Sequence, residues 1–272
     1  MKMKKKIVAA FAAAAAAILI SGWHDAANAT PSTHIWSPST DVQAYGVFHL
    51  TSDMYLPVKK DAYGTRLNTV TNVGLTTGVL PYEKLNLEVG FDHIAGFGSL
   101  DAYPLYLNAK VGVPENAYGE MFPALAAGVY SYGTKTGGEA RTGMTPKIGT
   151  DYNIYYAKAA KTIGQAGRFS LGYYSGNKKL LVDENGESAE NGVLLCWERT
   201  ISEISENLWA SVDYMGGKSG FGALSYGFSW KFAPNTSVIF GYVAPNNDKL
   251  AAVADTFTVQ VDIDFDVFNK KK

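Results

Sequence analysis

Apolar and polar residues alternate through most of this chain. The last stretch, TFTVQVDIDFDVF, is the clearest: from Phe257 to Val267 every second residue is apolar, and Asp262, Asp264 and Asp266 fall on the polar phase. Successive side chains of a β-strand point to opposite faces, so a period of two predicts a strand with one apolar and one polar face. The three carboxylates then stack along one side of this strand.

About twelve segments carry this signature, and a helical period is nearly absent. The clearest segments are 85–92, 105–113, 169–174, 208–214, 224–232 and 257–267, and weaker ones lie at 41–55, 69–80, 122–132, 150–161, 193–201 and 236–244. The phase of 150–161 is ambiguous. Long and short connections alternate along the chain, as in LPVKKDAYGTRLN followed by LPYEK. The pattern therefore predicts an all-β, antiparallel, up-and-down arrangement with long loops at one end and short turns at the other.

The first 29 residues differ from the rest. A Lys-rich start is followed by an Ala-rich apolar stretch and by Ala27-Asn28-Ala29, a small-x-small site. This is the pattern of a secretory signal peptide that is cleaved before Thr30. We therefore expect a cleaved signal peptide over 1–29 and a single domain over 30–272, with a retained membrane-anchor helix as the alternative.

Composition narrows the class of protein. Without the four Lys and the one Asp of residues 1–29, the exported chain has 20 basic and 24 acidic residues, a net charge of −4. This balance gives no basis for nucleic-acid binding. Cys196 is the only cysteine, so no internal disulfide can form. No apolar run after the signal is long enough for a transmembrane helix. The overall hydropathy suits a soluble protein or a membrane barrel, because half of each barrel strand faces a polar lumen.

The contents of the two strand faces favour a membrane barrel. The polar faces hold Gly, Ser, Asn, Asp and Lys, without the dense Lys and Glu of a solvated sheet. The apolar faces place Tyr173, Tyr214 and Tyr242 near one end and Trp230 and Phe232 near the other, as in the aromatic belts of membrane barrels. In this patterning the chain resembles bacterial outer-membrane β-barrel proteins, and it looks like a small porin-like barrel of about twelve strands. A secreted or periplasmic β-sandwich or soluble barrel is the alternative.

The resemblance implies a closed transmembrane barrel with short periplasmic turns, long extracellular loops and a polar lumen. The inward phase supplies the candidate lumen or filter residues, which are Asp262, Asp264, Asp266, Lys110, Lys231, Glu88 and Asp213. Charges of both signs can pair and plug a narrow lumen, or they can line a water path that sorts solutes by charge. Twelve strands give an intermediate bore, so both outcomes stay open.

We expect a passive, porin-like channel for small polar solutes in the bacterial outer membrane, with a modest preference for cations. The alternative is a plugged structural or surface-interaction barrel that acts through the loops 56–67, 133–149 and 176–192. The expected partners are outer-membrane lipid, the barrel-assembly machinery during insertion, and small polar solutes.

An outer-membrane hydrolase is a further alternative, with a site at the barrel rim. The candidate rim residues are His49, Asp53, Asp92 and His93. The first three could cluster, because only one strand separates the two strands that carry them. No serine is clearly placed with them and the spacing matches no motif, so we do not expect an enzyme. Cys196 falls on a polar phase as a small lumen residue. No His/Cys spacing fits zinc, so we expect no cofactor or metal.

Overall fold

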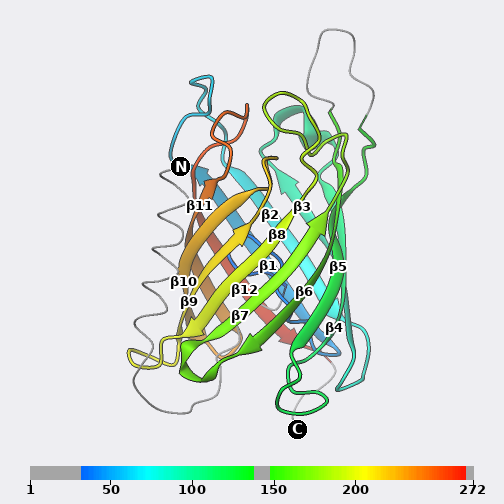
Figure 1. Ribbon diagram of the computed structural model, residues 1–272, viewed down its shortest axis with the longest axis vertical. Helices are drawn as coiled ribbons and strands as arrows, with labels where there is room; N and C mark the ends of the chain where they lie inside the picture. Colours follow the sequence, from blue (N-terminus) through cyan, green and yellow to red (C-terminus); the bar gives the residue numbers. More distant parts are fainter. Residues whose placement is uncertain (1–31, 138–147, 268–272) are drawn as a thin grey trace.

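The chain forms a closed barrel of twelve antiparallel strands, shown in the computed structural model of Figure 1. The structure describes residues 32–137 and 148–267. Each strand pairs with its neighbours in sequence, and β12 pairs with β1 along the whole of β1, which closes the ring. The expected class and topology are confirmed. The predicted signal peptide lies outside the described residues and stays a prediction.

The twelve strands and two short 3-10 helices follow one another without a crossover. The elements are β1 (Val47–Pro57), β2 (Val70–Gly78), β3 (Asn86–Ala95), η1 (Gly98–Ala102), β4 (Leu105–Val113), β5 (Ala124–Gly133), β6 (Asp151–Thr162), η2 (Gly164–Ala166), β7 (Arg168–Ser175), β8 (Asn191–Thr200), β9 (Leu208–Met215), β10 (Ala223–Ala233), β11 (Thr236–Pro245) and β12 (Thr256–Asp266). No helix in the described segments is long and apolar enough to cross a membrane.

The alternation of the sequence becomes an inner and an outer face. In β12, Thr258 and Gln260 are 0% and 3% exposed, whereas the large apolar residues Phe257 and Phe265 are 38% and 46% exposed. The same contrast recurs around the ring. Large apolar residues exposed on the outer face include Val73, Val89, Phe91, Leu105, Leu107, Leu171, Val193 and Phe228. The polar face therefore points inward and the apolar face outward, as the pattern predicts. In β6, whose phase was ambiguous, the buried Ile154 and Tyr156 belong to the inward set.

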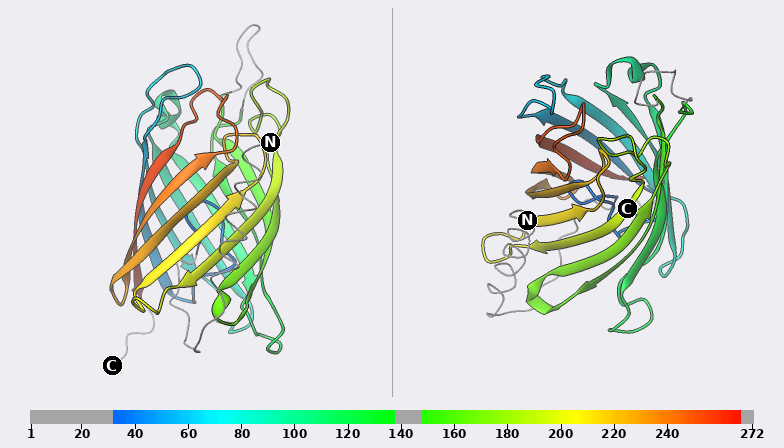
Figure 2. Two further views of the ribbon diagram at one scale, coloured as in Figure 1. Left: turned by 60° about the vertical axis from the view of Figure 1, so that its left-hand side comes forward. Right: turned by 45° about the horizontal axis from the view of Figure 1, so that its top comes forward.

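The two ends of the barrel differ in their connections. At one end, called the loop end, the connections are 58–69, 96–104, 134–150, 176–190, 216–222 and 246–255. At the other, called the turn end, they are 79–85, 114–123, 163–167, 201–207 and 234–235. Figure 2 shows the two sets at opposite ends of the barrel. Part of the connection 134–150 lies outside the described residues.

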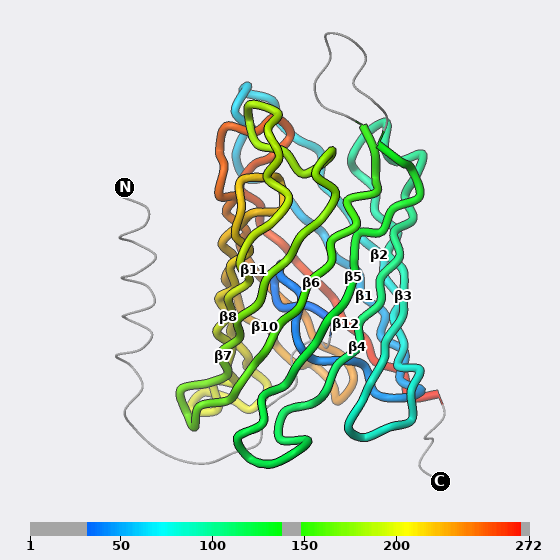
Figure 3. Tube along the Cα trace, turned by 45° about the vertical axis from the view of Figure 1, so that its right-hand side comes forward, coloured from blue at the N-terminus to red at the C-terminus, as the bar shows by residue number. Residues whose placement is uncertain are grey.

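Residues 32–46, called here the lumen segment, run inside the barrel before β1 begins. Figure 3 shows their blue trace enclosed by the ring of strands. The alternating pattern predicts the first strand from residue 41, but β1 begins at Val47. The physical reason is that residues 40–43 direct their polar groups to charged side chains of the lumen. They therefore do not extend the strand ladder.

Candidate functional site: a lumen divided by an internal segment

The first turn of the lumen segment is closed by its own backbone. Thr33 and Pro38 form an antiparallel bridge. The His34 N–H donates to the Ser37 carbonyl at 2.9 Å, and the Ser39 N–H donates to the Ser32 carbonyl at 3.2 Å. Residues 34–37 thus form a tight turn whose remaining N–H groups point outward from it and need acceptors.

Asp213 of β9 supplies those acceptors. Its carboxylate accepts the N–H groups of Ile35 at 3.0 Å, Trp36 at 3.4 Å and Ser37 at 2.9 Å. Successive backbone N–H groups form a concave site for an anion, and here the anion is a side chain of the barrel wall. From β12, Gln260 donates to the Ile35 carbonyl at 2.8 Å. The turn is therefore held by two strands of the wall, β9 and β12, which are separated by β10 and β11.

Glu88 of β3 and Lys110 of β4 anchor the two ends of the lumen segment. They form a buried ion pair at 3.3 Å. Glu88 also accepts from the Ser32 hydroxyl at 3.0 Å and from the Gln43 N–H at 2.8 Å, and Lys110 donates to the Ser32 carbonyl at 3.2 Å. A buried ion pair is stable only when its remaining hydrogen-bonding capacity is used, and the segment uses it.

A third anchor lies on β6, β7 and β8. Lys158 donates to the Pro38 carbonyl at 2.8 Å, and Glu198 lies 3.3 Å from the imidazole of His34. The Arg168 guanidinium contacts both oxygens of Asp41 at 2.8 Å. Paired Arg and carboxylate groups give directional, charge-assisted hydrogen bonds. Together the three anchors attach the segment to most of the circumference of the barrel.

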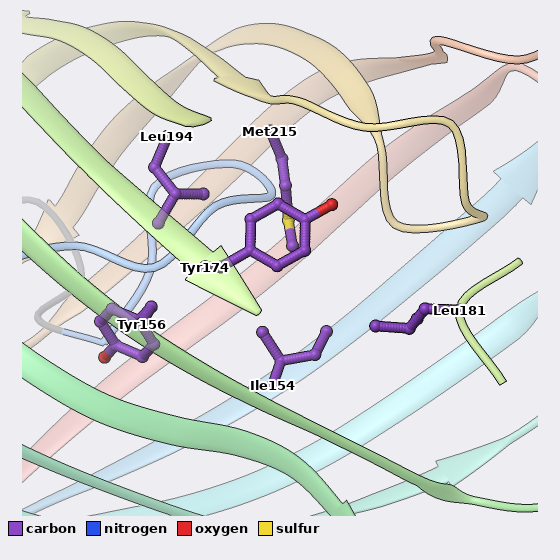
Figure 4. Packing of buried hydrophobic residues seen from close by; sticks show 6 residues of the cluster. All are labelled: Ile154, Tyr156, Tyr174, Leu181, Leu194 and Met215. Atoms are coloured by element: carbon purple, nitrogen blue, oxygen red, sulfur yellow. The ribbon is translucent and has the colours of Figure 1, made fainter. Parts of the chain in front are cut away.

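The β6–β11 side of the lumen is filled with apolar side chains and is called here the filled half. One buried cluster brings Ile35 of the lumen segment against the barrel residues Trp209, Ala223, Ile239 and Val243. A second cluster consists of Ile154, Tyr156, Tyr174, Leu181, Leu194 and Met215, and Figure 4 shows these side chains gathered in the lumen. The side chains of these two clusters pack like the core of a soluble protein, and Tyr156, Leu181, Ala223 and Val243 also border the cavity of the opposite half.

The β1–β4 side is open and is called here the hollow half. A cavity of about 1100 Å³ extends from the loops of the loop end down to the lumen segment. Its floor includes Ile35, Trp36 and Pro38. Within the described residues, no turn-end connection lines this cavity. The lumen segment therefore separates the cavity from the turn end.

The wall of the hollow half carries a ladder of carboxylates and amides across four adjacent strands. Asn72 of β2 donates to Asp53 of β1 and to Asp92 of β3, each at 3.1 Å, and Asn108 of β4 donates to Asp92 at 2.8 Å. A Cβ added at Gly74 would lie 2.5 Å from Asp92 Oδ1. Glycine at this inward position thus leaves the space that the carboxylate occupies.

Aromatic rings connect the cavity floor to its other walls. Trp36 of the lumen segment packs edge-to-face on Tyr55 of β1 with ring centroids 5.6 Å apart, and its indole N–H donates to the Phe221 carbonyl at 2.9 Å. The Phe221 ring lies 5.1 Å from that of Tyr152 and 6.3 Å from that of Tyr130. The cavity therefore has an acidic, amide-bearing wall and an aromatic boundary.

The structure places the predicted rim residues in three environments. Asp53 and Asp92 come together through Asn72. His49 lies apart from that ladder, with its ring nitrogens 3.2 Å from Asp262 and 2.8 Å from Asp264. His93 is exposed on the outer face, because Asp92 takes the inward position of β3.

The predicted lumen residues also divide. Glu88, Lys110 and Asp213 bind the lumen segment, as described above. Asp262 lines the cavity, whereas Asp264 lies below it and accepts from the Gln43 side chain at 3.4 Å. Asp266 is exposed at the last position of β12, and Lys231 lies half-buried near the turn end of β10. Cys196 is buried in the lumen, with its Sγ atom 3.4 Å from Ser211 Oγ.

Several functional residues were not singled out from the sequence. They are Trp36, Asp41, Asn72, Lys158, Arg168 and Glu198. One signal was present: charged residues recur in mid-strand inward positions, as at Lys158 and Glu198, where a narrow lumen must pair them. The described residues contain no group of three or more His, Cys, Asp or Glu side chains arranged to hold a metal ion.

Among known proteins, solved structures of porins show similarity to this chain at low identity. No family model matches it, and no curated protein matches it. Among solved structures it is similar to OmpF of Salmonella typhi in complex with daunomycin, with a TM-score of 0.41 and 9% identity over 80% of this chain and 96% of that one. The NanC porin gives a TM-score of 0.42 and 9% identity over 79% and 98% of the two chains. A mutant of Rh. blastica porin gives 0.34 and 16% over 72% and 55%.

At the level of class, the strand order by itself defines a closed, antiparallel β-barrel of twelve strands. The identities are low and the three TM-scores lie below 0.5. What this barrel does must therefore be inferred from its own residues.

Proposed function

We propose that the protein is an outer-membrane channel for small polar solutes, entered at the loop end and closed toward the turn end by the lumen segment. The observation that carries the proposal is the cavity of about 1100 Å³ that runs from the loops to that segment along a polar wall. In this orientation the loops are extracellular and the turns periplasmic, as in bacterial barrels of this class.

The outer face supports a membrane location. Large apolar side chains are exposed around the ring, such as Phe91 at 42% and Leu171 at 62%. A soluble protein rarely exposes apolar surface on this scale, whereas a lipid-facing band requires it. Aromatic pairs such as Tyr226 with Tyr242, stacked at 5.7 Å, belong to this outer surface.

Passage of a solute requires the lumen segment to move. Its anchors at Glu88, Asp213 and Arg168 are polar and mostly buried, and water or solute groups can replace polar contacts one at a time. Most of the filled half can stay packed meanwhile, because Ile35 is the buried cluster member that the lumen segment supplies. The acidic wall of the cavity and the anchors of Glu88 and Lys110 lie on the β1–β4 side. We therefore place the conducting path in the hollow half.

The proposed cation preference comes from the wall of this path. Asp53, Asp92 and Asp262 line the cavity. The ring of His49 faces Asp262 and Asp264, so that pair contributes less negative charge to the path than the sequence alone indicates. Carboxylates along a pore favour cations over anions.

Planar-bilayer conductance of the refolded full chain tests the proposal. The unmodified protein should show small or intermittent conductance. The Glu88→Gln/Asp213→Asn double variant loosens two anchors and should show larger, steadier currents with cation preference. Glu206→Gln, which makes the same type of charge change in the turn 201–207, is the matched control and should behave as the unmodified protein. If neither the unmodified protein nor the folded double variant conducts, the channel proposal fails.

A plugged barrel that acts through its loops is the second candidate, and the filled half favours it. Its loops are also braced against one another. Asp61 in 58–69 accepts the N–H of Ala252 in 246–255 at 3.1 Å, and the same hydrogen bond lowers the pKa of Asp61. Lys59 forms an ion pair with Asp255 at 2.5 Å. Absence of conductance together with protease cleavage of these loops on intact cells would support this candidate.

A further inference from the structure

We propose that the hollow half binds a small organic cation, an ammonium compound with an apolar or aromatic body. The ammonium group would lie against Asp53, Asp92 and Asn72, and the body against Trp36 and Tyr55. The inference rests on the proposed function in one respect, since it treats the cavity as the entrance for solutes. Binding itself requires no transport.

The ladder presents acceptors to the cavity. Asp53 accepts from Thr51 at 2.7 Å and from Asn72, and Asp92 accepts from Asn72 and Asn108. Within the described residues neither Asp53 nor Asp92 forms an ion pair with Lys, Arg or His. Two buried or half-buried carboxyl groups that are bonded only to neutral donors have no ion-pair partner when they ionise, and a bound cation would supply one.

The orientation of Asn72 points to the same ligand. Its amide nitrogen donates to both Asp53 and Asp92, which fixes the amide oxygen on the other side. That oxygen is buried and has no hydrogen-bond partner. An alkylammonium group carries three donors and no acceptor, so it can satisfy an amide oxygen and two carboxylates together. An anion at the same place would be repelled by both carboxylates, and the donors of Thr51, Asn72 and Asn108 there are already bonded to them.

A second unpartnered acceptor lies next to the ladder on β12. Asp262 is 6% exposed and lines the cavity. One of its oxygens lies 3.2 Å from His49 Nε2, and the other, Oδ2, is buried without a partner. In the β1–β12 register Thr51 pairs with Asp262 and Asp53 with Gln260, so Asp262 and Asp53 are diagonal neighbours on the inward face. Each unsatisfied buried oxygen costs stability that a donor would recover.

The aromatic boundary completes the site. Trp36 and Tyr55 line the same cavity as the ladder, and they hold each other edge-to-face. Aromatic faces attract organic cations through the quadrupole of the ring, and the attraction grows where water is excluded. Positive side chains also line the cavity, but Arg66, Lys178, Lys179 and Lys249 come from the loops at its mouth. The basic side chains deep in the cavity are Lys110, which is paired with Glu88, and His49, which lies against Asp262 and Asp264.

Equilibrium binding to the full chain in detergent micelles tests this site. The probes are phenethylammonium and 3-phenylpropionate, which have similar size and opposite charge. Calorimetry should detect saturable binding of the cation, with the anion bound at least about tenfold more weakly, the loss expected for one charge-assisted hydrogen bond. Quenching of tryptophan fluorescence that follows the same isotherm would agree with contact at Trp36.

Two variants decide the assignment. Asp53→Asn/Asp92→Asn keeps the shape of the ladder and should weaken cation binding at least about tenfold, the loss expected for one charge-assisted hydrogen bond, while Glu206→Gln leaves it unchanged. Trp36→Leu, a change outside the strand ladder, should weaken it several-fold and provides the test if the double variant does not fold.

Equal binding of cation and anion, or binding unchanged in both folded variants, would overturn the site. Cation binding without any conductance would retain the site and reject the channel. Conductance without cation binding would retain the channel and reject the binding site.

Discussion

The two halves of the lumen are built from strands with the same alternating pattern, but one half is packed with apolar side chains and the other contains the cavity. In the filled half the inward positions hold large side chains such as Leu194, Trp209 and Met215. In the hollow half they hold Gly74, Asn72 and Asp92. Alternation decides which residues face inward, but their size and polarity decide whether the interior becomes a core or a cavity.

The difference also separates two kinds of stabilisation. Apolar packing in the filled half gains from burial and from close contacts. The ladder of the hollow half replaces water with hydrogen bonds and gains little net free energy from each. We therefore expect substitutions in the filled half to affect unfolding strongly and those in the hollow half to affect ligand or ion behaviour more than unfolding.

The largest expected effect is on the filled half. Leu194→Ala, at a position with 0% exposure beside Met215, should lower the free energy of unfolding by about 2–5 kcal/mol because it leaves a cavity in a packed cluster. Thr76→Ala on the hollow wall should cost less than about 1 kcal/mol. Urea titration in lipid vesicles, followed by tryptophan fluorescence, measures both. Equal costs would contradict the division of the lumen into two halves.

An intermediate effect is expected where the hollow half leaves space for its carboxylates. Gly74→Ala would bring a methyl group to 2.5 Å from Asp92 and 2.8 Å from Thr51, so the ladder must shift, at a cost of about 1–3 kcal/mol. Gly220→Ala is the matched control, because its added methyl would meet only Val253, at 3.4 Å. The same urea titration compares them. If the two variants are equally stable, the ladder is not held in place by the geometry described.

The smallest effect is expected at the seam between the halves. Glu115, in the turn after β4, forms an ion pair with Lys161 at 3.0 Å and accepts the Thr162 N–H at 2.8 Å. Burial opposes its charge, but these hydrogen bonds outweigh burial and lower the pKa of Glu115. A carboxyl with a lowered folded-state pKa stabilises the fold above its unfolded pKa of about 4.3, and this is lost as the pH falls through the folded value.

Glu115→Gln should therefore be less stable than the unmodified protein at pH 7, by under about 1 kcal/mol. The difference should shrink as the pH falls below about 4, where Glu115 becomes protonated. Urea midpoints of the two proteins at pH 7 and pH 3 measure this gap. A gap that stays constant with pH would assign the effect to shape and not to charge.

The strands could be predicted from the sequence because their signal is local. The period of two in 105–113 matches β4 residue for residue, and the inward phase of Thr258, Gln260 and Asp262 was evident from residue type alone. The closure of the barrel and the order of its strands could be predicted from the alternation of long loops and short turns. Strand ends shifted by only a few residues, except at β1.

The lumen segment could not be predicted in the same way, because its partners are remote in sequence. Residues 32–40 show no period, and residues 41–46 carry a strand pattern that they do not follow. Ser32, Ile35 and Gln43 find their partners 45 to 225 residues away. The ladder could be predicted only in part from the sequence, for a related reason. Asp53 and Asp92 could be placed at one rim, but their link through Asn72 depends on the register of β1, β2 and β3.

The turn at Ile35 has a consequence for assembly. Its two main supports, Asp213 and Gln260, lie 178 and 225 residues further along the chain. Contacts this distant form late, because the intervening chain must be ordered first. In an open sheet the binding site for the lumen segment does not exist, because that site requires β9 and β12 to face the same interior space. The lumen segment precedes all twelve strands in the chain and is thus among the last parts to be fixed, because its binding site is complete only when the ring has closed.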